Sequence, residues 1–147
     1  MVCSTSYRPA LTTLCNPLPP ARPVVLSIDD DPDISAVLQR RLSARGVEVI
    51  GAYHGMQGFW LASTRRPGVI ITDLNMPQGR GDYVVECLKR NSNTAHIPVI
   101  VLSGRWSHQE RQRLWKLGIE EFLAKPIDFQ VLCEALARFI IFAPESE

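Results

Sequence analysis

The chain has 147 residues, of which 46% are hydrophobic and 21% are charged, and this length and composition suit one globular domain better than two. The 16 basic and 15 acidic residues give a formal net charge of +1, so no overall field favours nucleic acid or an anionic membrane surface as a partner. Membrane insertion is not expected either, because no apolar run approaches the roughly 18 residues of a span and the N-terminus lacks the pattern of a secretory signal.

A proline-rich extension over residues 1–22 comes first along the chain. Its prolines stand among small and polar residues, and it shows neither helical nor strand periodicity over a useful length. We therefore expect a flexible extension here, a folded domain over residues 23–141 and a short C-terminal tail over residues 142–147.

From residue 23 onward, short apolar runs alternate with longer stretches of 3.6-residue periodicity. This alternation is typical of repeated βα units on a parallel sheet. Strands that helices cover on both faces should be rich in Val, Ile and Leu. Five segments fit that description: Val24–Ile28, Val47–Ala52, Val69–Thr72, Ile97–Leu102 and Ile119–Ala124.

The first helix is predicted from its start signals. Asp31 is a plausible N-cap residue, and Pro32 suits the first helical position. An apolar stripe follows and ends near Gly46. The stripe consists of Ile34, Val37, Leu38 and Leu42.

Four further helices fill the other intervals. The pattern over residues 56–64 is the weakest because two glycines lower its helix propensity, and its apolar surface comes from Phe59, Trp60 and Ala62. Helices are also predicted over residues 82–90 and 107–117. Asp128 caps the last one, in which apolar residues recur at helical spacing. These residues are Val131, Leu132, Ala135, Leu136 and Phe139.

Chargeable side chains stand where three of the predicted strands end. Asp29 and Asp30 follow the first strand, Asp73 follows the third and Lys125 follows the fifth. In an open α/β sheet the carboxyl ends of the strands form the edge at which ligands bind. Three carboxylates gathered there would repel one another unless a cation compensated them. The pattern therefore predicts a site for Mg²⁺ and a phosphoryl group.

Four motifs in this order make the chain resemble the receiver domain of two-component response regulators, over about residues 23–141. The motifs are the acidic cluster after the first strand, Asp73-Leu74-Asn75-Met76-Pro77, Ser103-Gly104 and Lys125-Pro126. The resemblance implies an α/β fold of the flavodoxin-like class, with a doubly wound five-stranded parallel sheet in strand order 2-1-3-4-5 and five helices. It also implies a cis peptide bond before Pro126.

The resemblance assigns chemical roles at the strand ends. Asp73 would be the phosphoacceptor, which takes the phosphoryl group from a histidine kinase or a histidine phosphotransfer protein. Lys125 would neutralise charge on the transferring group, and the Ser103 hydroxyl would bind a phosphoryl oxygen and thereby create a second arrangement of the surface.

A Mg²⁺ ion is the cofactor that the resemblance implies. Asp30 would bind it directly and Asp29 through a coordinated water. The Asp73 carboxylate and the backbone carbonyl of Asn75 would complete the protein's share of an otherwise hydrated shell. Asp31 is favoured as the helix cap rather than as a ligand, because Pro32 follows it.

A switch and partner surface is expected around the fourth helix, the fifth strand and the fifth helix. Phe122 occupies the aromatic position that in many receivers couples to the fourth-strand hydroxyl by changing rotamer. Trp106, Arg111 and Trp115 add residue types that are enriched in binding hot spots. We expect a downstream effector protein or a second copy of the chain to bind this face.

Two residues, Trp115 and Arg80, allow both a functional and a purely structural interpretation. Trp115 is as readily a core residue, since apolar neighbours define a buried stripe beside it. Arg80, in the loop before the third helix, could hold a phosphoryl group or a partner carboxylate, but a solvated side chain is the favoured interpretation.

The cysteines indicate a reducing compartment. Cys3, Cys15, Cys87 and Cys133 lack any C-x-x-C spacing, and two of them fall inside predicted helices, where a free thiol packs as a small hydrophobic group. We therefore expect a cytoplasmic protein.

The leading hypothesis is a stand-alone phosphoacceptor switch, because the remaining length holds no second folded domain. Such a protein is a signalling domain that promotes its own phosphotransfer and dephosphorylation, and not an enzyme with a separate substrate. The alternative is a pseudo-receiver that serves as a phosphorylation-independent binding or scaffold module. A phosphatase of the haloacid dehalogenase type fits poorly, because it would need an Asp-x-Asp-x-Thr start and a cap insertion.

Overall fold

The computed structural model describes residues 21–76 and 81–144. The expectations that concern the extension before residue 21, Arg80, the thiols of Cys3 and Cys15, and residues 145–147 lie outside the described residues.

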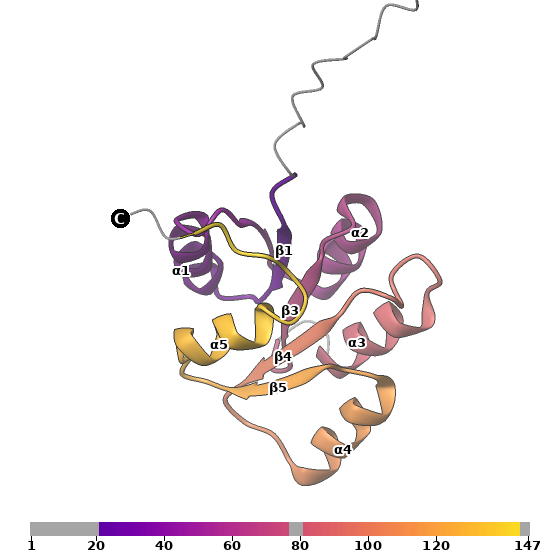
Figure 1. The fold of residues 1–147 in the computed structure, drawn as a ribbon. Helices are drawn as coiled ribbons and strands as arrows, with labels where there is room; N and C mark the ends of the chain where they lie inside the picture. The colour runs from indigo at the N-terminus through magenta and orange to yellow at the C-terminus, as the bar shows by residue number, and fades with distance from the viewer. Residues whose placement is uncertain (1–20, 77–80, 145–147) are drawn as a thin grey trace, which may run out of the picture.

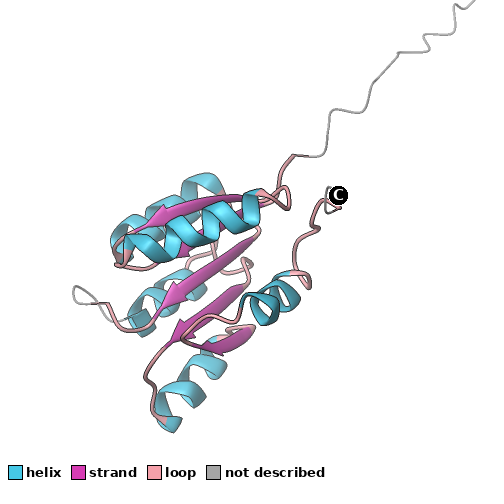
Figure 2. Cartoon of the chain, turned by 90° about the vertical axis from the view of Figure 1, so that its left-hand side faces the viewer, coloured by secondary structure: helices cyan, strands magenta, loops and turns pink. Residues whose placement is uncertain are grey.

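Within these residues, five parallel strands form one sheet in the order β2-β1-β3-β4-β5, as the resemblance implied (Figure 1). Helices α1 and α5 cover one face, and α2, α3 and α4 cover the other, so the sheet is a middle layer between two helical layers (Figures 1 and 2). The strands are β1 (Val24–Ile28), β2 (Glu48–Ala52), β3 (Val69–Asp73), β4 (Val99–Ser103) and β5 (Glu121–Ala124). The helices are α1 (Pro32–Ser43), α2 (Gly55–Arg65), α3 (Gly81–Arg90), α4 (His108–Leu117) and α5 (Phe129–Leu136).

Alternation along the strands builds a separate apolar core on each face of the sheet. In β4, Val99 and Val101 join the core beneath α2, α3 and α4, whereas Ile100 and Leu102 join the core beneath α1 and α5. Every residue of β3 and β4 is buried. The rigid centre of the sheet therefore ends directly at the polar groups that follow these two strands.

Three of the predicted strands begin too early, by one residue at Val47 and by two residues at Ile97 and Ile119. The amides of Ile97 and Ile119 bond to the carbonyls of Thr94 and Leu114 in the preceding turns and not to a neighbouring strand. Both isoleucines are nevertheless buried in the core, at 1% and 4% exposure. A buried β-branched residue in a turn has the same sequence signal as a strand residue, which explains the error.

Two helices, α1 and α5, begin with the caps that were predicted for them. An Asp31 carboxylate oxygen accepts a hydrogen bond from the Asp33 amide at 2.9 Å, and Asp128 caps α5 in the same way. Ser107 and Glu110 form a reciprocal capping box at the start of α4. Asp31 is thus occupied as a helix cap, as expected.

The predicted apolar stripes are wider than the buried ones. Val37 on α1, Trp60 on α2 and Val131 on α5 are 37%, 61% and 42% exposed, because each lies on the flank of a helix that meets the sheet along a narrower line. Helix α5 also ends at Leu136, so Phe139 packs from the turn beyond it.

Candidate functional site

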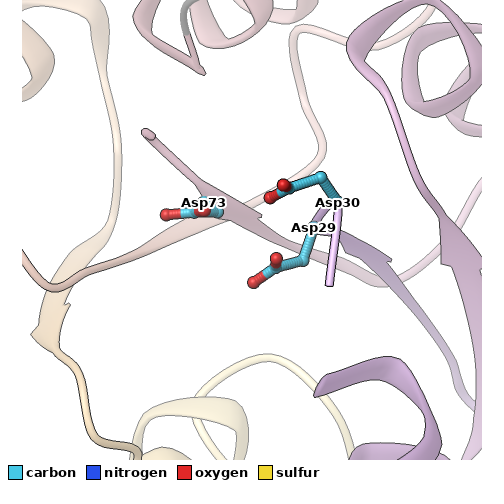
Figure 3. Close-up of side chains that lie close together, drawn as sticks. All are labelled: Asp29, Asp30 and Asp73. Atoms are coloured by element: carbon cyan, nitrogen blue, oxygen red, sulfur yellow. The ribbon is translucent and has the colours of Figure 1, made fainter. Parts of the chain in front are cut away.

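Three carboxylates meet at the carboxyl edge of the sheet. Asp29 and Asp30 follow β1, Asp73 ends β3, and the pairing of Ile28 with Thr72 places these positions side by side. One carboxylate oxygen from each residue lies within 4.8 Å of the others (Figure 3). Asp29 and Asp73 are buried, and Asp30 is exposed. The structure therefore brings together the acidic side chains that the sequence analysis had placed at one edge.

Lys125 supplies the ammonium group opposite this cluster. Its Nζ donates a hydrogen bond to Asp29 Oδ2 at 2.8 Å and lies 3.5 Å from Asp73 Oδ2. Burial of Lys125 works toward a lower pKa, but the hydrogen bond and charge of Asp29, followed by those of Asp73, raise the pKa above its ordinary 10.5. The side chain is therefore a fixed cation at neutral pH. The peptide bond that follows it is cis, as the resemblance implied.

Asp73 is incompletely compensated. Burial raises the pKa of its carboxyl above the ordinary 3.8; a hydrogen bond from the Asn75 amide and the charge of Lys125 oppose this shift, and the charge of Asp29 adds to it. The Asn75 amide lies 3.2 Å from Asp73 Oδ1. A carboxylate that is desolvated and repelled by a neighbour favours a further positive group beside it.

Ser103 lies at the end of β4, fully buried beside the cluster. Its hydroxyl donates a hydrogen bond to the Arg105 carbonyl at 2.7 Å and accepts one from the Asn75 side-chain amide at 3.0 Å. The same amide also donates to the Arg105 carbonyl at 3.2 Å. In this structure the hydroxyl is therefore engaged by the loop that follows β4.

A hollow of about 480 Å³ opens over these groups. It is lined by Asp73, Asn75, Gly104, Arg105 and Lys125. Arg105 was not expected as a lining residue, and the hydrogen bonds of the Asn75 side chain were not predicted. No sequence signal could have revealed them, because both depend on the path of the loop after β4.

Three of the expected surface residues form one aromatic cluster. Trp106 packs edge-on against Phe122, with ring centroids 5.0 Å apart, and the Arg111 guanidinium lies 5.7 Å from the centre of the Phe122 ring. Phe122 is only 7% exposed. Trp115 is 41% exposed on α4, which decides between the two interpretations left open for it in favour of the surface.

The comparisons with known proteins agree with this geometry. The family model that matches, over residues 25–137, is described as the response regulator receiver domain. The transcriptional regulatory protein PrrA of Mycobacterium tuberculosis is 40% identical over 116 residues, which cover 79% of this chain and 48% of PrrA. The chain thus spans about half the length of PrrA. PilH of Pseudomonas aeruginosa is 30% identical over 114 residues, which cover 76% of this chain and 93% of PilH.

Solved structures show the same likeness. The chemotaxis protein CheY4 of Vibrio cholerae superposes with a TM-score of 0.75 at 29% identity, over 82% of this chain and 100% of CheY4. Histidine kinases are also among the relatives. In the described part of the chain, no helix has the length and apolar character needed to cross a membrane.

Proposed function

The chain belongs to the response regulator receiver domain family, and from this premise we propose that Asp73 accepts a phosphoryl group from a histidine kinase or a histidine phosphotransfer protein. Receiver domains are signalling domains of two-component systems. The observation that carries the proposal is the position of Asp73: its carboxylate lies in the wall of the hollow, within salt-bridge distance of Lys125 and close to two other carboxylates.

Receiver domains bind Mg²⁺ at an acidic pocket, and the residues present here fit that ion. Three carboxylates lie close together, two of them beside the Lys125 ammonium group, and their oxygens are the hard ligands that Mg²⁺ prefers. We propose that Asp30, Asp73 and the Asn75 carbonyl would bind the ion, with Asp29 acting through water. When bound, the ion would neutralise negative charge on the phosphoryl oxygens.

The proposed step exchanges one bond to phosphorus for another. A carboxylate oxygen of Asp73 forms the new P–O bond while the P–N bond of phosphohistidine breaks, and the electron pair of that bond stays on the imidazole nitrogen. Such a reaction depends mainly on positioning and electrostatics. Lys125 would hold a phosphoryl oxygen as a fixed cation, since its Nζ already lies 3.5 Å from Asp73.

We further propose that phosphorylation changes the surface around β5 and α4. A Ser103 hydroxyl that turned to a phosphoryl oxygen would leave the Arg105 carbonyl, and Trp106 is the next residue along this loop. The packing of Trp106 on Phe122 would then change, and with it the face on which Arg111 and Trp115 lie. That face is the proposed contact for an effector protein or a second copy of the chain.

The proposal is tested by intact-mass measurement after incubation with Mg²⁺ and a small phosphodonor. The wild type should gain one phosphate, which is acid-stable and base-labile, and Asp73→Asn should gain none. Asp33→Asn is the matched control, because Asp33 is an exposed aspartate in the first turn of α1. An unmodified wild type at saturating donor would instead support the scaffold function.

A further inference from the structure

The side-chain amide of Asn75 joins two loops that the proposed reaction must separate. We propose that this amide is a latch: it holds the Ser103 hydroxyl and the Arg105 carbonyl in the unphosphorylated arrangement, and so sets how readily the domain accepts a phosphoryl group. The inference rests on the proposed function of Asp73. It concerns the side chain of Asn75 and is independent of the metal-binding role proposed for its backbone carbonyl.

Four hydrogen bonds connect the three residues of the latch, one of them from the Arg105 backbone amide to Ser103 Oγ. Asn75 Nδ2 donates to Ser103 Oγ at 3.0 Å and to the Arg105 carbonyl at 3.2 Å, and Ser103 Oγ donates its proton to the same carbonyl at 2.7 Å. These residues lie 28 and 30 positions apart from Asn75 in the sequence. One amide thus ties the loop after β3 to the loop after β4.

The direction of the effect follows from the single proton of the hydroxyl. Ser103 can donate only one hydrogen bond, and in this structure that bond goes to Arg105. A phosphoryl oxygen can receive the proton only if the Arg105 carbonyl gives it up. Because Asn75 holds the acceptor of this bond as well as Ser103 itself, the amide stabilises the arrangement that competes with phosphoryl binding.

Asn75 also contacts Asp73, through its backbone amide and not through its side chain. The backbone amide of Asn75 donates to Asp73 Oδ1 at 3.2 Å, so the latch begins at the residue that the proposed phosphoacceptor holds in place. At its other end, Arg105 precedes Trp106, whose ring packs on Phe122. Asn75 is therefore a positioning residue between the reacting carboxylate and the proposed partner surface.

The latch should stabilise the unphosphorylated arrangement by the free energy of one or two hydrogen bonds at the pocket. Loss of such bonds should shift the equilibrium between the two arrangements by about two- to tenfold. Asn75→Ala should therefore tighten the binding of beryllofluoride, a mimic of the phosphoryl group, by about that factor in the presence of excess Mg²⁺.

A double-mutant cycle with Ser103→Ala tests this. The dissociation constant of beryllofluoride is measured for the wild type, both single variants and the double variant, with Gln130→Ala as an amide-removal control on exposed α5. The latch requires tighter binding by Asn75→Ala and no such gain when Ser103 is absent. Unchanged or weaker binding by Asn75→Ala, or an equal gain in the Ser103→Ala background, would overturn it.

Hydrogen exchange of the Arg105 amide, without any ligand, separates failure of the latch from failure of the proposed function. This amide lies 3.3 Å from Ser103 Oγ, inside the latch. Asn75→Ala should speed its exchange several-fold relative to the wild type and to Gln130→Ala. An unchanged rate would contradict the latch, whereas failure of the wild type to bind beryllofluoride would contradict the proposed function of Asp73.

Discussion

The interior of the sheet is apolar and its carboxyl edge is charged, although both lie on the same strands. Along β3 and β4 the side chains alternate between two apolar cores, and all of them are buried. At the carboxyl edge of the same sheet, three carboxylates gather, and the Lys125 ammonium group contacts two of them, Asp29 and Asp73.

The difference separates the part of the molecule that stabilises the fold from the part in which charge is only partly compensated. The interior needs no further partner, because its apolar side chains pack against one another in the two cores. At the edge the negative charge is only partly compensated. Burial and the neighbouring carboxylate of Asp29 raise the pKa of Asp73, and Lys125 does not fully offset them. Substitutions should therefore destabilise the interior, and at the edge they should change binding and, in one case, increase stability.

The largest effect on stability is expected from truncation in the interior. Ile100→Ala removes a fully buried side chain from the core beneath α1 and α5 and should lower the free energy of unfolding by about 2–5 kcal/mol. Urea denaturation measures this value. Val131→Ala, at a 42% exposed position of α5, is the control and should stay within about 0.5 kcal/mol of the wild type. A small change for Ile100→Ala would contradict the close-packed interior.

Addition of Mg²⁺ should stabilise the edge. At a free ion concentration about tenfold above its dissociation constant, the free energy of unfolding should rise by about 1.4 kcal/mol. Asp30→Asn should lose most of this gain, because a neutral amide is a weaker ligand, while Asp33→Asn should keep it. Equal gains in the two variants, measured by thermal unfolding with and without Mg²⁺, would remove Asp30 from the ligand set.

Asp73→Asn should increase the free energy of unfolding at neutral pH when Mg²⁺ is absent. Since the pKa of Asp73 is raised in the folded state, the charged form disfavours folding. The stability that Asp73 contributes is fully present below its ordinary pKa of 3.8 and is lost as the pH rises through the raised value. The difference in free energy of unfolding between Asp73→Asn and the wild type should therefore grow as the pH rises, and denaturation at several pH values measures it. A difference that shrinks instead would show that Lys125 overcompensates the charge.

The smallest effect is expected from charges on the outer surface. Arg113 contacts Asp82 at 2.7 Å and Glu86 at 3.1 Å, which ties α4 to α3, but its side chain is 50% exposed. Arg113→Ala should cost less than about 1 kcal/mol, and high salt should reduce this cost. A larger loss of stability that salt does not reduce would contradict this account, because an exposed ion pair would then matter as much as the buried charges at the edge.

The edge was predictable from the sequence because its residues are fixed by strand ends. Once β1 and β3 are recognised as parallel neighbours, Asp29 and Asp73 must lie close together whatever the loops do. The strand order itself came from the resemblance to receiver domains, and it also places the end of β5, and with it Lys125, at the edge where Asp29, Asp30 and Asp73 gather.

Features that depend on loop paths or on helix flanks were not predictable. The Asn75 side chain could have faced solvent, and its contacts with Ser103 and Arg105 exist only because the loop after β4 folds back over the pocket. Helical periodicity placed Val37 and Val131 in apolar stripes, but the width of the contact with the sheet decides burial, and the sequence does not contain that width. Trp115 was ambiguous for the same reason.

The most direct test of the proposed phosphoacceptor is to locate the phosphate by peptide mapping of the wild type after reaction with Mg²⁺ and a small phosphodonor. Our proposal predicts a single modified peptide, the one that contains Asp73, with a phosphate that hydroxylamine removes. A phosphate on any other residue, or none after exhaustive reaction, would contradict it.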